Sequence, residues 1–163
     1  MHFRIDDPGF WGQCPADYLR PLVERSEADG VPLSIFAVGD PHDPETPAFA
    51  VFRMGPGEVL PRHSHPCERF EVIMQGSMEV RSPEEPGLQL KAGDVMRAAP
   101  NELYGPHVAG PEGFTVAEYF SRLAGVYQLT LDTRRGLWTR NLLDEYRAAG
   151  AGRSGNSSEP EVR

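Results

Sequence analysis

Short runs of β-branched and aromatic residues, separated by glycine and proline, recur along the chain from residue 48 onward. The 17 glycines and 16 prolines are spread between these runs and do not cluster. This spacing is typical of many short strands joined by turns, and it differs from the strand–helix alternation of a parallel α/β fold. The pattern therefore predicts an all-β sandwich or barrel. The predicted strands are residues 48–54, 59–65, 70–74, 78–81, 88–90, 95–98 and 114–120, with 127–131 as one further candidate.

The segment before the predicted barrel, residues 1–47, combines a helix-like and a strand-like stretch. Apolar residues within 15–28 recur on one helical face, which predicts an amphipathic helix. Pro21 fits this helix only in its first turn, where a missing backbone N–H does no harm. A strand-like run follows at residues 31–38. We expect this extension to pack on the barrel or on a partner chain.

The barrel itself is expected over residues 48–132, and a C-terminal helix over 133–149. The clearest helical pattern covers residues 141–149, where Asn141 is a good N-cap residue. Residues 150–163 are rich in Gly, Ser, Glu and Arg, so we expect a disordered tail there.

Composition and charge exclude several classes of function. The formal net charge is -8, and no cluster of basic residues marks a nucleic-acid surface. No run of about 18 apolar residues marks a membrane span, and the N-terminus lacks the apolar segment of a signal peptide. We therefore expect a cytoplasmic protein that binds neither nucleic acid nor membrane. Cys14 and Cys67 lie far apart and are expected to be free thiols.

Two histidines two residues apart are the strongest chemical signal in the sequence. Residues at positions i and i+2 of a strand point to the same face, so His63 and His65 would project together, about 6–7 Å apart along the strand. Two imidazoles placed in this way can hold one ion, since imidazole suits Fe, Cu, Ni and Zn. The alternative is a pair of exposed strand histidines without a ligand.

Two stretches around these histidines resemble the motifs of the cupin superfamily. Residues 57–76 resemble the first motif, with Gly57, His63, His65 and Gly76 in the family's places. Residues 93–107 resemble the second motif, with the proline one residue late. The resemblance covers residues 48–122 and implies a cupin-type jelly-roll β-barrel with short helical segments at both ends. It also implies a bound metal ion and a homodimer.

The sequence departs from the family's pattern at two ligand positions. The family's glutamate falls at Arg69, which cannot bind a cation. Glu68 and Glu71 flank it, and strand parity favours Glu71, which could instead pair with an arginine. The second motif's histidine is matched by His107, two or three residues late, where a bulge near Pro106 could bring it in. The predicted metal ligands are His63, His65, His107 and Glu71.

Three further side chains are candidates for the pocket. Tyr104 could donate its phenol to a substrate. Glu118 either faces solvent or is an inward base with a raised pKa. Arg69 could bind an anionic group of a substrate. The candidate catalytic residues are Glu71, Tyr104 and Glu118, and the candidate substrate-pocket residues are Arg69 and Tyr104.

Three functions are compatible with these residues. The first is a metal-dependent enzyme, in particular an Fe(II) dioxygenase acting on a small organic molecule, with Mn, Ni, Cu or Zn as alternative ions. The second is a non-catalytic module that binds a small molecule or a metal. The third is a metal-free isomerase with a histidine and a tyrosine as its acid and base, which would lose activity when His63 or Tyr104 is substituted. The fold implied by the resemblance does not decide between them.

Overall fold

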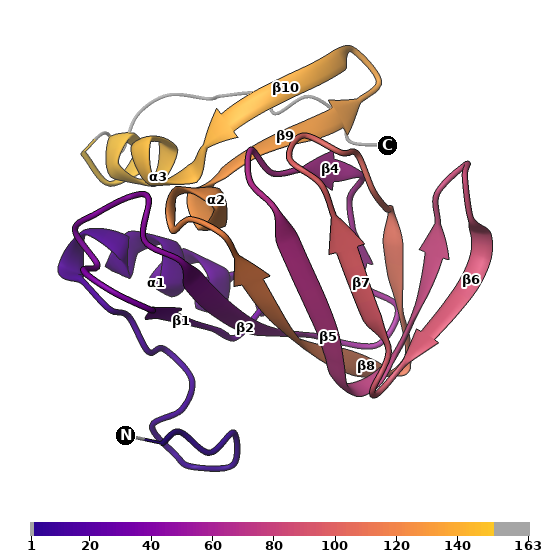
Figure 1. Ribbon diagram of the computed structural model, residues 1–163, viewed down its shortest axis with the longest axis horizontal. Coiled ribbons are helices and arrows are strands. Elements are labelled where there is room, and N and C mark those ends of the chain that lie inside the picture. Colours follow the sequence, from indigo (N-terminus) through magenta and orange to yellow (C-terminus); the bar gives the residue numbers. More distant parts are fainter. Residues whose placement is uncertain (1, 152–163) are drawn as a thin grey trace.

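Two antiparallel sheets face each other in the computed structural model, which describes residues 2–151 (Figure 1). The larger sheet has the strand order β1-β2-β8-β5-β6, with β3 also paired to β8 and β7 to β5. The smaller sheet has the order β10-β9-β4. The strands are β1 (Leu33–Ala37), β2 (Ala48–Met54), β3 (Val59–Leu60), β4 (His63–Ser64), β5 (Arg69–Arg81), β6 (Pro86–Lys91), β7 (Val95–Ala98), β8 (His107–Phe120), β9 (Gln128–Thr133) and β10 (Gly136–Asn141).

Short helices lie toward both ends of the described chain. They are a 3-10 turn, η1 (Asp17–Leu19), and the α-helices α1 (Arg20–Ala28), α2 (Ala124–Tyr127) and α3 (Leu142–Ala151). The prediction of an all-β fold with helical segments at both ends is confirmed. No helix among residues 2–151 is both long enough and apolar enough to cross a membrane.

The long strands β5 and β8 form the centre of the larger sheet. The sequence predicted two strands in place of β5, with a turn at residues 75–76. The structure instead keeps one strand and accommodates the extra residues as irregularities of the β5–β8 register. Gly76 has a φ of 73° and lies against the carbonyl oxygen of Gly113. Only glycine adopts this conformation without strain, so the chain bends here without leaving the sheet.

The predicted strand at residues 59–65 is divided between the two sheets. β3 pairs with β8 in the larger sheet, and β4 pairs with β9 in the smaller one. The chain passes from the larger sheet to the smaller one at Pro61, which has no backbone N–H to donate to a neighbouring strand. The first half of β8 was not predicted, because its glycines and Pro111 resemble turn residues.

The C-terminal segment differs from the prediction at its start. Residues 136–141 form β10, which makes a hairpin with β9, so the helix does not begin at residue 133. Asn141 caps α3 as predicted, since its Oδ1 accepts the backbone N–H groups of Leu143 at 3.2 Å and Asp144 at 3.4 Å. Of the predicted tail, residues 150–151 belong to α3, and the rest lies outside the described residues.

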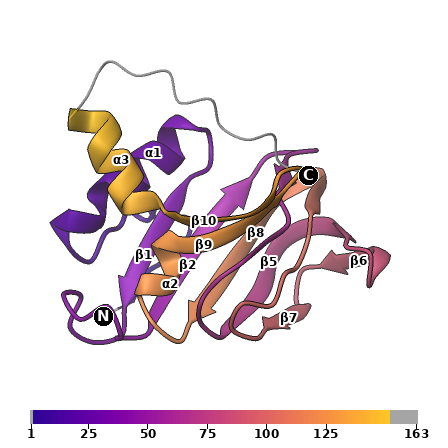
Figure 2. The same cartoon turned by 90° about the horizontal axis from the view of Figure 1, so that it is seen from above.

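Helices α1 and α3 pack side by side at one end of the sheets (Figure 2). Pro21 lies in the first turn of α1, as expected. Leu22 and Val23 of α1 and Leu143 of α3 are buried in one apolar cluster with Phe120 of β8. A second cluster, around Ile73 and Val116, fills the other part of the larger sheet's inner face. The polar site described next shares this inner face.

Candidate functional site

Six buried polar side chains and the half-buried Tyr104 lie together on the inner face of β5 and β8. The neighbouring sheet contributes β4 and the residue after it, and the segment before β8 contributes one more side chain. We call this group the polar cluster; its members are His63, His65, Arg69, Glu71, Tyr104, His107 and Glu118. The structure therefore brings all the predicted site residues into one region. Glu68 lies outside it, with an exposed side chain paired to Arg97 at 2.6 Å.

Arg69 holds the centre of the polar cluster. Its side chain is only 1% exposed and forms ion pairs with Glu71 and, at 3.0 Å, with Glu118. The guanidinium carbon lies 4.3 Å from the centroid of the Tyr104 ring and 5.6 Å from that of Phe120. A buried cation requires such partners, because desolvation without them is too costly. Arg69 therefore places a permanent positive charge where the first cupin motif has its glutamate.

The two carboxyl groups beside Arg69 carry different charges. Glu71 on β5 and Glu118 on β8 are directly opposite each other in the sheet. Burial alone would raise the pKa of Glu71. The Arg69 guanidinium and a hydrogen bond with Glu118 outweigh burial, so the pKa of Glu71 lies below its ordinary value. Burial and the neighbouring Glu71 raise the pKa of Glu118 well above its usual range. Glu118 thus stays protonated and donates a hydrogen bond to the Glu71 carboxylate. The single negative charge of Glu71 then balances the single positive charge of Arg69.

The ring nitrogens of His63 and His65 have defined roles. Nδ1 of His63 lies 2.6 Å from the carbonyl oxygen of Pro61, and Nδ1 of His65 lies 2.6 Å from that of Gly125. A carbonyl oxygen only accepts, so each Nδ1 carries the proton and each Nε2 is a bare acceptor. The Tyr104 hydroxyl donates to Nε2 of His63 at 2.6 Å.

The histidines of the polar cluster are neutral. Burial and His65 lower the pKa of His63 well below its usual range. Burial and the nearby Arg69 lower the pKa of His65 to about 3. Burial also lowers the pKa of His107, and it raises that of Tyr104 well above its ordinary value. At neutral pH each imidazole has one nitrogen able to accept a hydrogen bond, and the phenol of Tyr104 donates one to His63.

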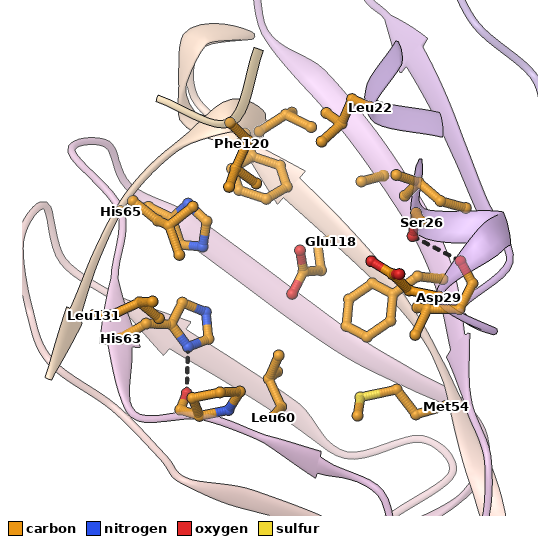
Figure 3. Close-up of a pocket in the computed structure, with 18 of the residues that line it drawn as sticks. Leu22, Ser26, Asp29, Met54, Leu60, His63, His65, Glu118, Phe120 and Leu131 are labelled. Atoms are coloured by element: carbon orange, nitrogen blue, oxygen red, sulfur yellow. Dashed lines mark hydrogen bonds between the residues drawn. The ribbon is translucent and has the colours of Figure 1, made fainter. Parts of the chain in front are cut away.

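A cavity of about 340 Å³, the first chamber, opens beside the polar cluster. Its walls are mostly apolar and come from β2, β9, α1 and α3. His63, His65 and Glu118 point into this chamber, opposite Leu22 of α1 (Figure 3). The volume suits a small organic molecule. The buried polar groups gather at one side, and Ser26 and the exposed Asp29 lie across from the histidines. An apolar body with one polar end would match these walls.

As folded, the polar cluster leaves no complete set of donors for the metal ion implied by the resemblance. The Arg69 cation lies among the donors and has already paired with both carboxyl groups. Nε2 of His63 accepts the Tyr104 hydroxyl. Within residues 2–151, no group of three or more histidine, cysteine, aspartate or glutamate side chains is arranged to hold one ion. The ligand roles stay predictions for His63, His65, Glu71 and His107.

Comparison with known proteins rests on structure, because no family model and no curated protein matches the sequence. One similar structure is an acetylacetone dioxygenase from Acinetobacter johnsonii, at 18% identity and a TM-score of 0.51, covering 74% of this chain and 78% of that one. Another is an RmlC-like cupin protein from Ralstonia eutropha, at 17% identity and a TM-score of 0.50, covering 78% and 80% of the two chains. The chain has the cupin fold. Identities this low establish the fold and not the activity, and the cupin fold hosts both enzymes and binding modules.

Some features of this site carry no signal in the sequence. The carbonyl groups of Pro61 and Gly125, which fix the histidine tautomers, are backbone atoms brought close by folding. The walls from α1 and α3 are distant in the chain. Glu118 faces inward, which was one of its two predicted orientations, and Glu71 pairs with Arg69, which was one of its two predicted roles.

Proposed function

We propose that this cupin is a metal-independent acid–base enzyme acting on a small, partly apolar carbonyl compound. The observation that carries the proposal is the buried Arg69, whose charge and ion pairs take the place of a metal-binding carboxylate. A second cation close to Arg69 would be repelled in a medium of low dielectric constant. The reaction class is proton transfer next to a carbonyl group, as in an isomerase.

The groups facing the first chamber can divide the acid and base roles between them. Glu118 carries a proton at neutral pH, because of its raised pKa, and can protonate a carbonyl oxygen. Nε2 of His65 carries no proton and takes one from the adjacent carbon only as Glu118 gives up its own, because the new Glu118 carboxylate then offsets the charge of a second cation near Arg69. Both transfers together turn a ketone into an enol, leaving a Glu118 carboxylate and a His65 imidazolium. The ion pair with Arg69 stabilises that carboxylate as it forms.

Tyr104 and His63 support this arrangement beside the chamber. The Tyr104 hydroxyl donates to Nε2 of His63, so the two side chains hold each other in place. The Tyr104 ring also covers the guanidinium of Arg69. The mostly apolar walls exclude water and accept the apolar body of the substrate.

Deuterium exchange would test the acid–base proposal. A panel of small ketones is incubated with the protein in D₂O, with and without EDTA, and NMR follows deuterium entering the carbon next to the carbonyl. We expect exchange with wild-type protein and loss of exchange in Glu118→Gln and in His65→Gln. The matched control is Glu79→Gln, since Glu79 lies on the same β5 strand and pairs with Arg81 at the surface. Exchange that EDTA abolishes, or binding without exchange, would overturn the proposal.

A second candidate function is the metal-dependent, dioxygenase-like enzyme suggested by the resemblance. One observation favours it: His63 and His65 both donate Nδ1–H to a backbone carbonyl, with ring centroids 5.1 Å apart. Metal-binding histidines are commonly held in this way. His107 and Glu71 would complete the ligands, with Fe(II) favoured over Mn, Ni, Cu or Zn.

Elemental analysis separates the two candidates. Near one Fe, Mn, Ni or Cu per chain in untagged protein, lost in a His63→Ala/His65→Ala double variant, would support the metal enzyme and overturn the acid–base proposal. No metal in either protein after reconstitution would exclude the metal enzyme. The homodimer and the cytoplasmic location stay predictions, and sedimentation velocity tests the first of them.

A further inference from the structure

A second cavity, of about 480 Å³, lies on the other side of the polar cluster; we call it the second chamber. β5, β6 and β7 and the segment leading into β8 line it. Of the residues lining the two chambers, only Arg69 belongs to both. The proposed acid–base reaction does not use the second chamber, although two of the predicted metal ligands, Glu71 and His107, line its polar end.

The polar end of the second chamber holds buried groups without partners. His107 is 1% exposed, and neither of its ring nitrogens has a hydrogen-bond partner within residues 2–151. Nε of Arg69 is also buried and without a partner in the described part of the chain. Buried polar groups in native proteins nearly always have a partner, so these atoms point to a molecule bound between them.

Tyr104 brings the two unpartnered groups into one place. Its ring centroid lies 4.3 Å from the guanidinium carbon of Arg69 and 5.7 Å from the ring centroid of His107. A neutral imidazole offers one donor and one acceptor, and Nε of Arg69 adds a second donor. A matching ligand therefore needs an oxygen that accepts and a nearby hydroxyl that donates.

The charge around the second chamber disfavours an anionic ligand. Glu71 lies at the polar end, and Glu85 and Glu102 lie toward the surface with the exposed cation of Arg97. Glu84, also in the wall, is paired with Arg62 at 2.9 Å. The remaining walls are apolar, with Val80, Leu88 and Leu90 among them. Leu88 and Val95 are 40% and 59% exposed, so the chamber reaches solvent along β6 and β7.

We propose that the second chamber binds a small neutral molecule with a carbonyl and a hydroxyl group on adjacent carbons. The carbonyl oxygen accepts from Nε of Arg69 and from the N–H of His107, and the hydroxyl donates to the other nitrogen of His107. The apolar walls hold the rest of the ligand. The chamber is thus a ligand site separate from the acid–base site.

The test uses hydroxyacetone as the probe and protein labelled with ¹⁵N in its histidines. NMR follows the ring nitrogens of His107, which are assigned by their loss in His107→Phe. We expect saturable shifts with hydroxyacetone and roughly five- to tenfold weaker binding of acetone, which lacks the hydroxyl and so loses one hydrogen bond. Acetate is expected to bind more weakly still.

Two surface variants keep the test independent of folding defects. Val95→Trp narrows the mouth of the second chamber and is expected to weaken the response of His107. Val59→Trp, at an exposed position of the first chamber, is the matched control and is expected to leave that response unchanged. Unresponsive His107 signals would mean that water alone is the partner, and that result overturns the proposal. Equal binding of acetone, or shifts confined to His63 and His65, would overturn it as well.

Discussion

Acidification should destabilise the protein through His65. The side chain is buried beside Arg69, so a proton on Nε2 would add a second buried cation. The pKa of His65 is about 3 in the folded protein, against an ordinary value of 6.5. Above pH 6.5 the group is neutral in both states. Below it the unfolded chain takes up a proton that the folded protein refuses, so this contribution to stability is lost as the pH falls.

The size of the effect follows from the pKa difference. Each pH unit between the two values changes the free energy of unfolding by about 1.4 kcal/mol. At about pH 5.5, the loss from His65 alone is about 1.4 kcal/mol relative to about pH 7.5. This pH stays above the isoelectric point of about 5.1, where solubility is lowest. The lowered pKa of His63 also makes the free energy of unfolding fall as the pH falls. The raised pKa of Glu118 has the opposite effect, because its contribution to stability is lost as the pH rises.

A pair of variants isolates the contribution of His65. Urea denaturation at both pH values gives the free energy of unfolding of wild-type protein and of His65→Gln, which cannot titrate. We expect the wild type to lose about 1.4 kcal/mol more than the variant on acidification. Leu129→Ala, in the wall of the same chamber, should lower stability equally at both pH values. Equal losses in wild type and His65→Gln would refute the reasoning.

Three further predictions concern stability. Arg69→Met should lower the free energy of unfolding in urea by about 3–5 kcal/mol, because it leaves the Glu71 carboxylate buried and unpaired. Arg69→Met/Glu71→Gln should recover most of that loss, and a loss under about 1 kcal/mol in the single variant would contradict the assigned charges. Gly76→Ala should lower the melting temperature and the free energy of unfolding, the latter by about 1–3 kcal/mol or more, because the φ of Gly76 is 73° and a Cβ would collide with Gly113. An unchanged melting temperature would rule out this close approach. Asn141→Ala should cost about 1 kcal/mol through the lost cap of α3, seen as a lower urea midpoint, and Asn141→Ser should restore it.

The fold was predictable to the extent that it follows from local patterns. Alternating apolar residues and turn residues predicted the strands at 48–54 and 95–98 with the same limits as β2 and β7. The continuity of β5 was not predictable, because it depends on Gly76 lying against Gly113, far along the chain. β10 was missed because its pairing with β9 outweighs a weak local preference.

The candidate site was predictable in its orientation more than in its contacts. Strand parity placed Glu71 with the histidines and Glu68 outside, as the structure has them. Parity could not say which carboxyl group holds a proton, since that depends on how close Glu71, Glu118 and Arg69 approach after folding. The place of His107 depends on the course of the loop before β8, for which the sequence has only an irregular motif.

The packing of α1 against α3 has a consequence for the order in which the protein is made. Both helices line the first chamber, and Arg147 of α3 donates to the carbonyl oxygen of Tyr18 at 3.3 Å. Synthesis proceeds from the N-terminus, so α1 and the barrel leave the ribosome before α3 does. A nascent chain that ends before Leu142 has a complete polar cluster but an open chamber. The proposed ligand site in the first chamber is thus complete only after α3 has been synthesised and has docked.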